Sequence, residues 1–194
     1  RVRSEFLVAL FAADHISRNK GKISVVFPVN TSKGAREYVQ ESGGKAVISR
    51  IGYVFVHRVM VKHGASLGGE LSGHFYFRDF WGMDSGIFMM MQVLAVLEKT
   101  GISIKALTQQ YCVRAQSGEL NFTVADKASA IAKLKEAFAD AKQSELDGLT
   151  VAYPDWWCNV RPSNTEPFLR VNIEADTQEA LNIARKKIES IITQ

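Results

Sequence analysis

Apolar residues recur at helical spacing at the start of the chain, and short apolar runs joined by glycine follow them. The spacing of Phe6, Leu10 and Phe11 predicts a first helix that ends near residue 19. The later runs predict strands at 23–27, 46–48, 66–69 and 74–77, and helices ending near 42 and spanning 53–63 and 85–98. This order predicts an α/β layer structure with some parallel strand pairing.

The segment from Ser85 to Glu98 is apolar on nearly every side. A helix of this kind is normally buried, so we expect it in the core, with its methionines filling core space. The longest apolar run, residues 87–97, is interrupted by Gln92 and is too short to cross a bilayer. We therefore expect no membrane partner, and the lack of a signal-peptide pattern favours a cytoplasmic protein.

The pattern changes after Cys112, where strands dominate. We expect strands at 119–124, 149–152 and 168–174, a helix around 131–138 and a last helix from about 177 to 191. In the strand at 168–174 the odd-numbered residues form the apolar face, so Arg170 lies on the polar face. We place the domain boundary just after residue 114, which gives domains at 1–114 and 118–194.

The segment 161–170, between two predicted strands, combines charge, hydroxyls, an amide and two prolines. Guanidinium groups present planar forks of donors that suit a phosphate dianion. Short polar side chains at the turn add further donors, and the prolines restrict the backbone on both flanks. We interpret this loop as a phosphate clamp, with the candidate residues Arg161, Ser163, Asn164, Thr165 and, as the weaker candidate, Arg170. The alternative is a polar hairpin turn with surface arginines.

A second polar group of residues lies between Gly68 and His74, framed by glycines. Carboxylate, hydroxyl and imidazole groups are the kinds that hydrogen-bond sugar hydroxyls, and glycines let a ligand approach the backbone closely. Two strands joined by a short loop would aim Glu70, Ser72 and His74 into one cleft. The alternative is a hairpin whose polar residues only decorate the surface.

Composition fits a small anionic ligand. The chain has 194 residues, a formal net charge of +4 and a pI near 9.1, a modest basicity that a phosphorylated small molecule explains as well as a nucleic acid would. The densest basic run, residues 185–187, lies on a predicted amphipathic helix, so we expect no nucleic-acid partner. Two cysteines give no disulfide framework and four histidines no metal-ligand spacing, so we expect a reducing compartment and no metal in this chain.

Together the two loops resemble those of the α-D-phosphohexomutases, the family of phosphomannomutases and phosphoglucomutases. Glu70-Leu-Ser-Gly-His74 resembles the sugar-binding loop of that family, and Arg161-Pro-Ser-Asn-Thr165 followed by Arg170 resembles the phosphate-binding loop of its last domain. Residues 76–80 and 84–86 also match the sequence after the sugar loop in bacterial members. The resemblance covers the whole chain, as the third and fourth of four domains.

The resemblance implies a mixed α/β sugar-binding domain and then a smaller α+β domain with an antiparallel sheet, similar to the TATA-box-binding protein. Glu70 and Ser72 would bind the hexose hydroxyls with His74 beside them, and the 161–170 loop would clamp the phosphate already on the substrate. The family also carries a Lys-x-Gly-His segment about twenty residues before the sugar-loop glutamate.

That segment reads Arg50-Ile-Gly-Tyr53 in this chain. Arg50 keeps the positive charge of the family lysine but changes its geometry. Tyr53 replaces a histidine that titrates near neutral pH, so an acid–base role at this position is not expected to carry over. Both residues remain candidates for contact with the substrate.

The resemblance further implies an isomerase that moves a phosphoryl group between C1 and C6 of a hexose, an intramolecular phosphotransfer. That reaction needs a serine in a Ser-His-Asn-Pro segment and a magnesium loop of the Asp-Gly-Asp type, and the sequence contains neither. We therefore expect no catalytic residue in this chain and Mg²⁺ bound outside it. The expected partners are mannose or glucose 1- or 6-phosphate and the family's domains 1 and 2.

The chain begins without Met, which favours a fragment, and because both catalytic segments are missing we expect it to be inactive alone. Two alternatives stay open. One is a free-standing sugar-phosphate-binding module without chemistry, and the other, with little support, is a basic nucleic-acid binder whose affinity would fall steeply with salt.

Overall fold

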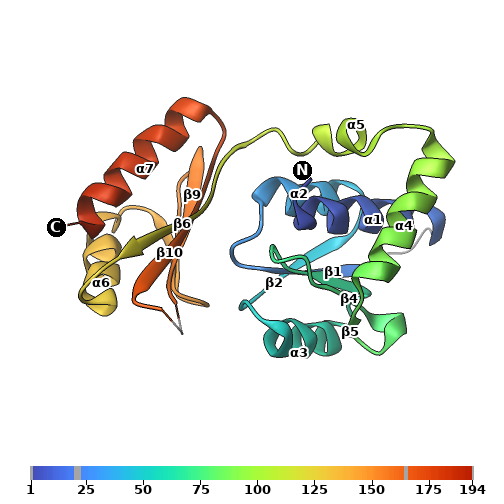
Figure 1. Ribbon diagram of the computed structural model, residues 1–194, viewed down its shortest axis with the longest axis horizontal. Helices are drawn as coiled ribbons and strands as arrows, with labels where there is room; N and C mark the ends of the chain where they lie inside the picture. Colours follow the sequence, from blue (N-terminus) through green and yellow to red (C-terminus); the bar gives the residue numbers. More distant parts are fainter. Residues whose placement is uncertain (1, 20–22, 164–165, 194) are drawn as a thin grey trace. The chain divides into compact units, whose positions relative to one another are not determined.

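The computed structural model describes residues 2–19, 23–163 and 166–193 (Figure 1). By its internal contacts the chain divides into two compact units, Arg1–Val113 and Arg114–Gln194. Each unit has its own sheet and its own buried apolar side chains. The chain therefore consists of two separately packed units joined in sequence at residues 113 and 114.

A five-stranded mixed sheet organises the first unit, in the order β2-β1-β3-β4-β5. β1, β2 and β3 are parallel, whereas β4 and β5 are added in antiparallel fashion at one edge. The strands are β1 (Ser24–Pro28), β2 (Lys45–Ser49), β3 (Leu67–Gly69), β4 (Phe75–Phe77) and β5 (Met83–Asp84). β1, which lies between β2 and β3, is buried almost throughout, as expected for a parallel strand covered on both faces.

Helices cover both faces of this sheet (Figure 1). Successive residues of a strand point to opposite faces, so Val25 and Phe27 join one core and Val26 joins the other. A short 3-10 helix, η1 (Arg78–Phe80), follows β4. The first core is completed by α1 (Ser4–Asn19), α2 (Lys33–Glu41), α4 (Gly86–Thr100) and α5 (Ile104–Gln109), and the second by α3 (Tyr53–His63).

The prediction that the helix at 85–98 is buried on nearly every side is wrong. In α4, Met89 is 1 % and Val96 is 4 % exposed, whereas Met90 and Leu94 are 56 % and 55 % exposed. One stripe of the helix packs on the core and the opposite stripe faces away from it, so of these two methionines only Met89 fills core space. Because both stripes are apolar, the sequence pattern does not distinguish them.

The second unit has an antiparallel five-stranded sheet in the order β6-β10-β9-β8-β7. Residues 169, 171 and 173 of β10 face the core, which leaves Arg170 on the other face as predicted. A mixed α/β unit followed by an antiparallel unit confirms the predicted fold class. The elements are β6 (Ala115–Thr123), α6 (Lys127–Ala137), β7 (Lys142–Ser144), β8 (Leu149–Ala152), β9 (Trp156–Pro162), β10 (Phe168–Ala175) and α7 (Gln178–Ile192), and both helices pack against the same core.

Candidate functional site

The loops that follow the parallel strands of the first unit carry the polar candidates. The carboxyl ends of neighbouring parallel strands meet at one edge of a sheet, where ligands of α/β proteins commonly bind. Arg50 and Gly52 follow β2, and Glu70 follows β3. The antiparallel return of β4 along β3 brings Ser72 and His74 to the same edge. The fold thus gathers residues that are up to 24 positions apart in the sequence.

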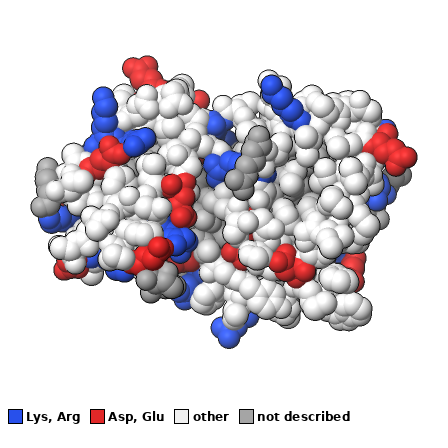
Figure 2. All heavy atoms as spheres, viewed as in Figure 1, with Lys and Arg blue, Asp and Glu red and all other residues white. Residues whose placement is uncertain are grey.

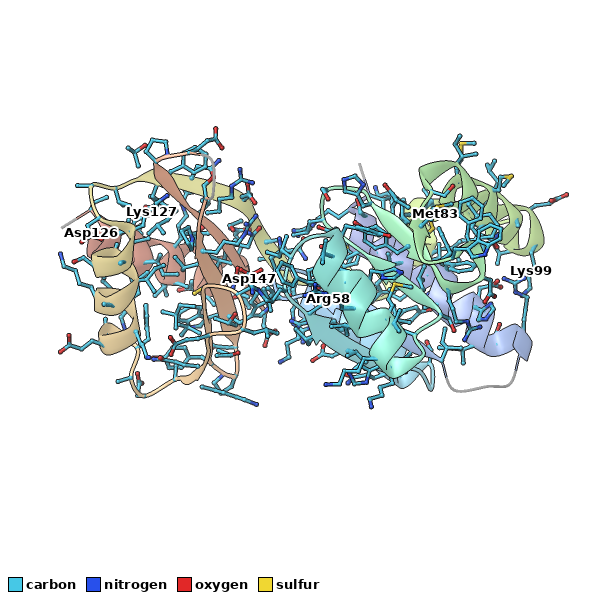
Figure 3. All side chains as sticks on the ribbon, turned by 90° about the horizontal axis from the view of Figure 1, so that it is seen from below. Arg58, Met83, Lys99, Asp126, Lys127 and Asp147 are labelled. Atoms are coloured by element: carbon cyan, nitrogen blue, oxygen red, sulfur yellow. The ribbon has the colours of Figure 1, made fainter. Side chains whose placement is uncertain are left out.

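A pocket of about 570 Å³ lies at this edge. Of the residues predicted to meet the sugar, Arg50 is not part of its lining, and its guanidinium lies 4.1 Å from the ring centroid of Phe55. The lining includes the other four predicted residues and is formed by Gly52, Tyr53, Glu70, Ser72, His74, Tyr76, Met83 and Asp84. Figure 3 labels Met83 in this unit.

Glu70 is buried, with 7 % of its surface exposed, and is held in place by hydrogen bonds. The Tyr76 hydroxyl donates to Glu70 Oε1 at 2.5 Å. The Glu70 N–H donates to the His74 carbonyl at 2.9 Å, and the Gly73 N–H donates to the Glu70 carbonyl at 3.1 Å, which closes the turn. Burial, and then the hydrogen bond to Glu70, raise the pKa of Tyr76 well above its usual value, so its hydroxyl stays a donor at neutral pH. Within the described residues, Glu70 Oε2 has no hydrogen-bond partner.

His74 forms a pair with Asp84 across the β4–β5 hairpin. His74 Nδ1 and Asp84 Oδ2 are 2.5 Å apart, and Asp84 Oδ1 accepts from the Phe75 N–H at 2.8 Å. The hydrogen bond to Asp84 raises the pKa of His74, burial opposes this, and the negative charges of Asp84 and Glu70 add to the rise. The His74 side chain is 55 % exposed, so its other ring nitrogen can meet a ligand, as an acceptor in the neutral ring and as a donor in the protonated ring.

Tyr53 contributes an aromatic wall to the pocket. Its ring centroid lies 5.4 Å from that of Tyr76 and 5.5 Å from that of His57. Tyr53 is 47 % exposed at the first turn of α3, which follows Gly52 at a φ of +111°. A half-exposed ring of this kind can pack against the apolar face of a sugar while its hydroxyl stays in water.

The second candidate loop joins β9 to β10 in the other unit. The Ser163 N–H donates to the Phe168 carbonyl at 3.0 Å and closes the base of the loop. Ser163 is 3 % exposed, and its Oγ and the Arg161 Nε are buried without a hydrogen-bond partner in the described part of the chain. Asn164 and Thr165 lie outside the described residues. Buried donors without partners are costly, so this is where an anion would gain most from binding.

Arg170 differs from its cross-strand neighbour Arg161 because carboxylates already surround it. Its guanidinium forms ion pairs with Glu166 at 3.1 Å and with Glu119 at 3.4 Å, and it lies 5.7 Å from the Phe168 ring centroid. In the described residues Arg161 forms no ion pair. The arginine with uncompensated charge is therefore Arg161.

Sequence reasoning missed three residues that hold these loops, namely Tyr76, Asp84 and Lys127. The two-residue spacing of His74 and Tyr76 in a strand places both on one face and could have revealed Tyr76. Lys127 is the first residue of α6, and its ammonium donates to the Ser163 carbonyl at 2.9 Å. No local pattern connects positions 36 residues apart in the sequence.

Metal and nucleic-acid binding find little support in the described residues. Residues 2–19, 23–163 and 166–193 contain no group of three or more His, Cys, Asp and Glu side chains that could hold a metal ion. In those same ranges no helix is long and apolar enough to cross a membrane. Figure 2 shows acidic and basic side chains interspersed on the face drawn, which offers no continuous basic track for a phosphate backbone.

Two protein-family models match this chain and together cover most of it. Residues 4–114 match the model described as phosphoglucomutase/phosphomannomutase, alpha/beta/alpha domain III, and residues 119–190 match the model of the C-terminal domain. The chain belongs to the phosphoglucomutase/phosphomannomutase family. The family resemblance of the two polar loops is thereby confirmed.

Individual relatives of the phosphoglucomutase/phosphomannomutase family agree. A phosphomannomutase of Methanocaldococcus jannaschii is 34 % identical over 193 residues, which cover 100 % of this chain and 43 % of that protein. The crystal structure of a phosphoglucomutase/phosphomannomutase family protein from Burkholderia thailandensis matches 98 % of this chain and 41 % of that chain, with 28 % identity and a TM-score of 0.84. The chain spans about two fifths of the length of the relatives it matches.

A more distant structure shares the fold. The N-acetylphosphoglucosamine mutase of Aspergillus fumigatus, solved in complex with GlcNAc-6P and magnesium, matches with a TM-score of 0.70 at 15 % identity, over 98 % of this chain and 43 % of that chain.

Proposed function

We propose that this chain is the substrate-binding C-terminal half of a phosphohexomutase that interconverts hexose 1-phosphate and hexose 6-phosphate. The observation that carries the proposal is the state of Glu70, which is buried and held through Oε1 by Tyr76, with no described partner for Oε2. A fixed carboxylate oxygen in a pocket of about 570 Å³ is an acceptor suited to a sugar hydroxyl.

We assign each of the two loops its own part of the substrate, the sugar to the first and a phosphate to the second. In the first domain, residues 1–114, Glu70 and Ser72 meet the hexose hydroxyls, with Tyr53 and His74 beside them. Arg50 would have to leave the Phe55 ring to take part. In the second domain, residues 118–194, the unpartnered buried donors support a phosphate site. Its residues are Arg161, Ser163, Asn164 and Thr165, with Arg170 the weaker member.

The chemical role of this chain is orientation and charge stabilisation. The sequence contains neither a Ser-His-Asn-Pro segment nor an Asp-Gly-Asp loop, so we assign the phosphoserine and the Mg²⁺ to domains 1 and 2 of the full-length enzyme. Holding the sugar in one geometry lowers the entropic barrier to phosphoryl transfer, and the bound metal offsets the charge that develops. His74, oriented by Asp84, places a ring nitrogen at the edge of the sugar pocket.

An apolar surface on the first unit supports the presence of further domains. Ile87, Met90, Met91 and Leu94 are exposed along one stripe of α4, and Trp81, close before that helix in sequence, is 78 % exposed. Contiguous apolar surfaces of this kind usually mark contacts with another protein surface. Because the chain covers 43 % of the Methanocaldococcus jannaschii enzyme, we propose domains 1 and 2 as the occupant of this stripe.

Turnover measurements test the proposed function. The purified chain, given glucose 1-phosphate, glucose 1,6-bisphosphate and Mg²⁺, is expected to show none, whereas a longer protein that contains it is expected to be active. In that longer protein, Glu70→Gln should lower kcat/KM about tenfold or more, because a charged hydrogen bond contributes about 1.5–3 kcal/mol. The exposed Glu136→Gln is the matched control. Mutase activity of the chain alone, or full activity of Glu70→Gln, would contradict the proposal.

A non-catalytic sugar-phosphate-binding module is the alternative, favoured by the absence of both catalytic motifs from the sequence. It predicts hexose-phosphate binding by the chain and no active longer protein. In either case we propose mannose or glucose phosphates as the ligands and the cytoplasm as the location.

A further inference from the structure

The loop between β9 and β10 has both of its ends bound by one ammonium group. Lys127 Nζ donates to the Ser163 carbonyl at 2.9 Å and to the Glu166 carbonyl at 3.2 Å. These carbonyls belong to the two sides of the loop, so one side chain links Ser163 to Glu166. A lysine in this position fixes the distance between the two flanks of the loop.

We propose that Lys127 is the second cationic group of the phosphate site, and that it acts both as a brace for the loop and as a charge beside the bound phosphate. This inference rests on the proposed function, because it takes the 161–170 loop as the phosphate-binding loop. It changes the pair of cations that the sequence indicates, from Arg161 with Arg170 to Arg161 with Lys127.

Charge balance is the main argument. A phosphate monoester near neutral pH carries between one and two negative charges. Arg170 is compensated by Glu166 and Glu119. Neither Arg161 nor Lys127 forms an ion pair with a carboxylate in the described residues. These two side chains therefore bring the net positive charge that a dianion needs.

Donor count points the same way. An ammonium group carries three N–H donors, and the two loop carbonyls account for two of those on Lys127. The third donor has no partner among the described residues. Arg161 Nε and Ser163 Oγ, on the same loop, are buried without described partners as well. Arg170 Nε, on β10, is also buried without a described partner, so four donors around this loop lack protein acceptors.

The local sequence explains how Lys127 reaches the loop. Asp126 caps α6, accepting from the Ala128 N–H at 2.9 Å and the Ser129 N–H at 3.0 Å. This cap fixes the first turn of the helix. The Asp126 carboxylate, the nearest one in sequence to Lys127, accepts hydrogen bonds from backbone N–H groups. Figure 3 labels Asp126 and Lys127 together at this end of the second unit. Lys127, at the first helical position, is thereby held beside the loop. It forms no ion pair with Asp126 in the described residues.

Lys127→Met tests the proposal, because methionine keeps most of the side-chain length and removes the charge. Binding of inorganic phosphate and of glucose 6-phosphate to the whole chain would be measured by NMR titration at low and moderate salt. We expect Lys127→Met to weaken binding of both ligands at least tenfold and to reduce the salt dependence of binding. Lys127→Arg should recover most of the affinity, since it restores the charge.

Lys133→Met is the matched control, because it makes the same change at an exposed position of the same helix. It should bind within twofold of the unaltered chain. Binding by Lys127→Met within twofold, an equal loss in Lys133→Met, or a Lys127→Arg variant as weak as Lys127→Met would each overturn the assignment of Lys127. Failure of the unaltered chain to bind either ligand would instead overturn the proposed function, and this inference with it.

Discussion

Tyr76→Phe removes a single oxygen atom from the wall of the candidate sugar pocket. Tyr76 is 2 % exposed, and its hydroxyl donates at 2.5 Å to a carboxylate on a residue that is 7 % exposed. A hydrogen bond to a charged group contributes about 1.5–3 kcal/mol, and its loss leaves a buried carboxylate oxygen without a donor. We therefore expect the free energy of unfolding of the first unit to fall by about 2 kcal/mol.

Urea unfolding followed by amide NMR signals of the first unit would measure this loss separately from unfolding of the second unit. Tyr111→Phe is the matched control, since its hydroxyl is also buried but donates at 2.9 Å to a neutral acceptor, the Phe6 carbonyl. Its loss should be nearer 1 kcal/mol, as for an ordinary neutral hydrogen bond.

A double-mutant cycle sharpens the test. Glu70→Gln keeps an acceptor opposite Tyr76 but removes the charge, so the two changes should couple by about 1 kcal/mol. Equal losses in Tyr76→Phe and Tyr111→Phe, together with a coupling energy of zero, would refute the claim that the Tyr76 hydroxyl holds Glu70 as a charged acceptor.

Three further outcomes are expected. The titration midpoint of His74, followed by NMR of its ring protons, should lie above the ordinary value of about 6.5, and Asp84→Asn should lower it. Because the folded-state pKa is raised, the stability from this pair should be full below pH 6.5 and lost as the pH rises through the folded midpoint. Met89→Ala should cost about 2–5 kcal/mol in thermal unfolding, whereas the exposed Met90→Ala should change stability by under about 0.5 kcal/mol. Gly148→Ala should destabilise the second unit by more than about 1 kcal/mol in urea, because φ is +66° and a Cβ would collide with a backbone oxygen of β9.

Local patterns in the sequence were sufficient for most of the elements. The helix predicted at 53–63 has those bounds in the structure, because an apolar stripe begins after Gly52 and a left-handed Gly64 ends it. The alternating strand at 168–174 was likewise predicted with the correct face for Arg170. Both features depend on neighbours within a few residues, which a single sequence displays directly.

Features that depend on distant contacts could not be predicted in this way. The apolar pattern of α4 does not indicate which stripe meets the core, because that depends on the position of the sheet. Similarly, the charge of Arg170 is compensated partly by Glu119, which is brought alongside by the pairing of β6 with β10. Lys127 reaches the loop between β9 and β10 only because α6 packs against the second sheet.

The candidate sugar site was found from the sequence because its main residues lie within one hairpin. Glu70, Ser72 and His74 lie within five consecutive residues and line one pocket. Tyr76 and Asp84 hold Glu70 and His74 in place through hydrogen bonds. The sequence alone did not predict these hydrogen bonds. A local motif therefore located the pocket, and only the packed strands showed how its groups are held.

Titration of the isotope-labelled chain with glucose 6-phosphate, observed at every backbone amide, tests the central claim most directly. The proposed function predicts weak binding, with shifts concentrated around Glu70 in the first unit and around Arg161 in the second. Shifts at only one of the two loops, or no shifts at either, would contradict the claim that this chain holds both the sugar and its phosphate.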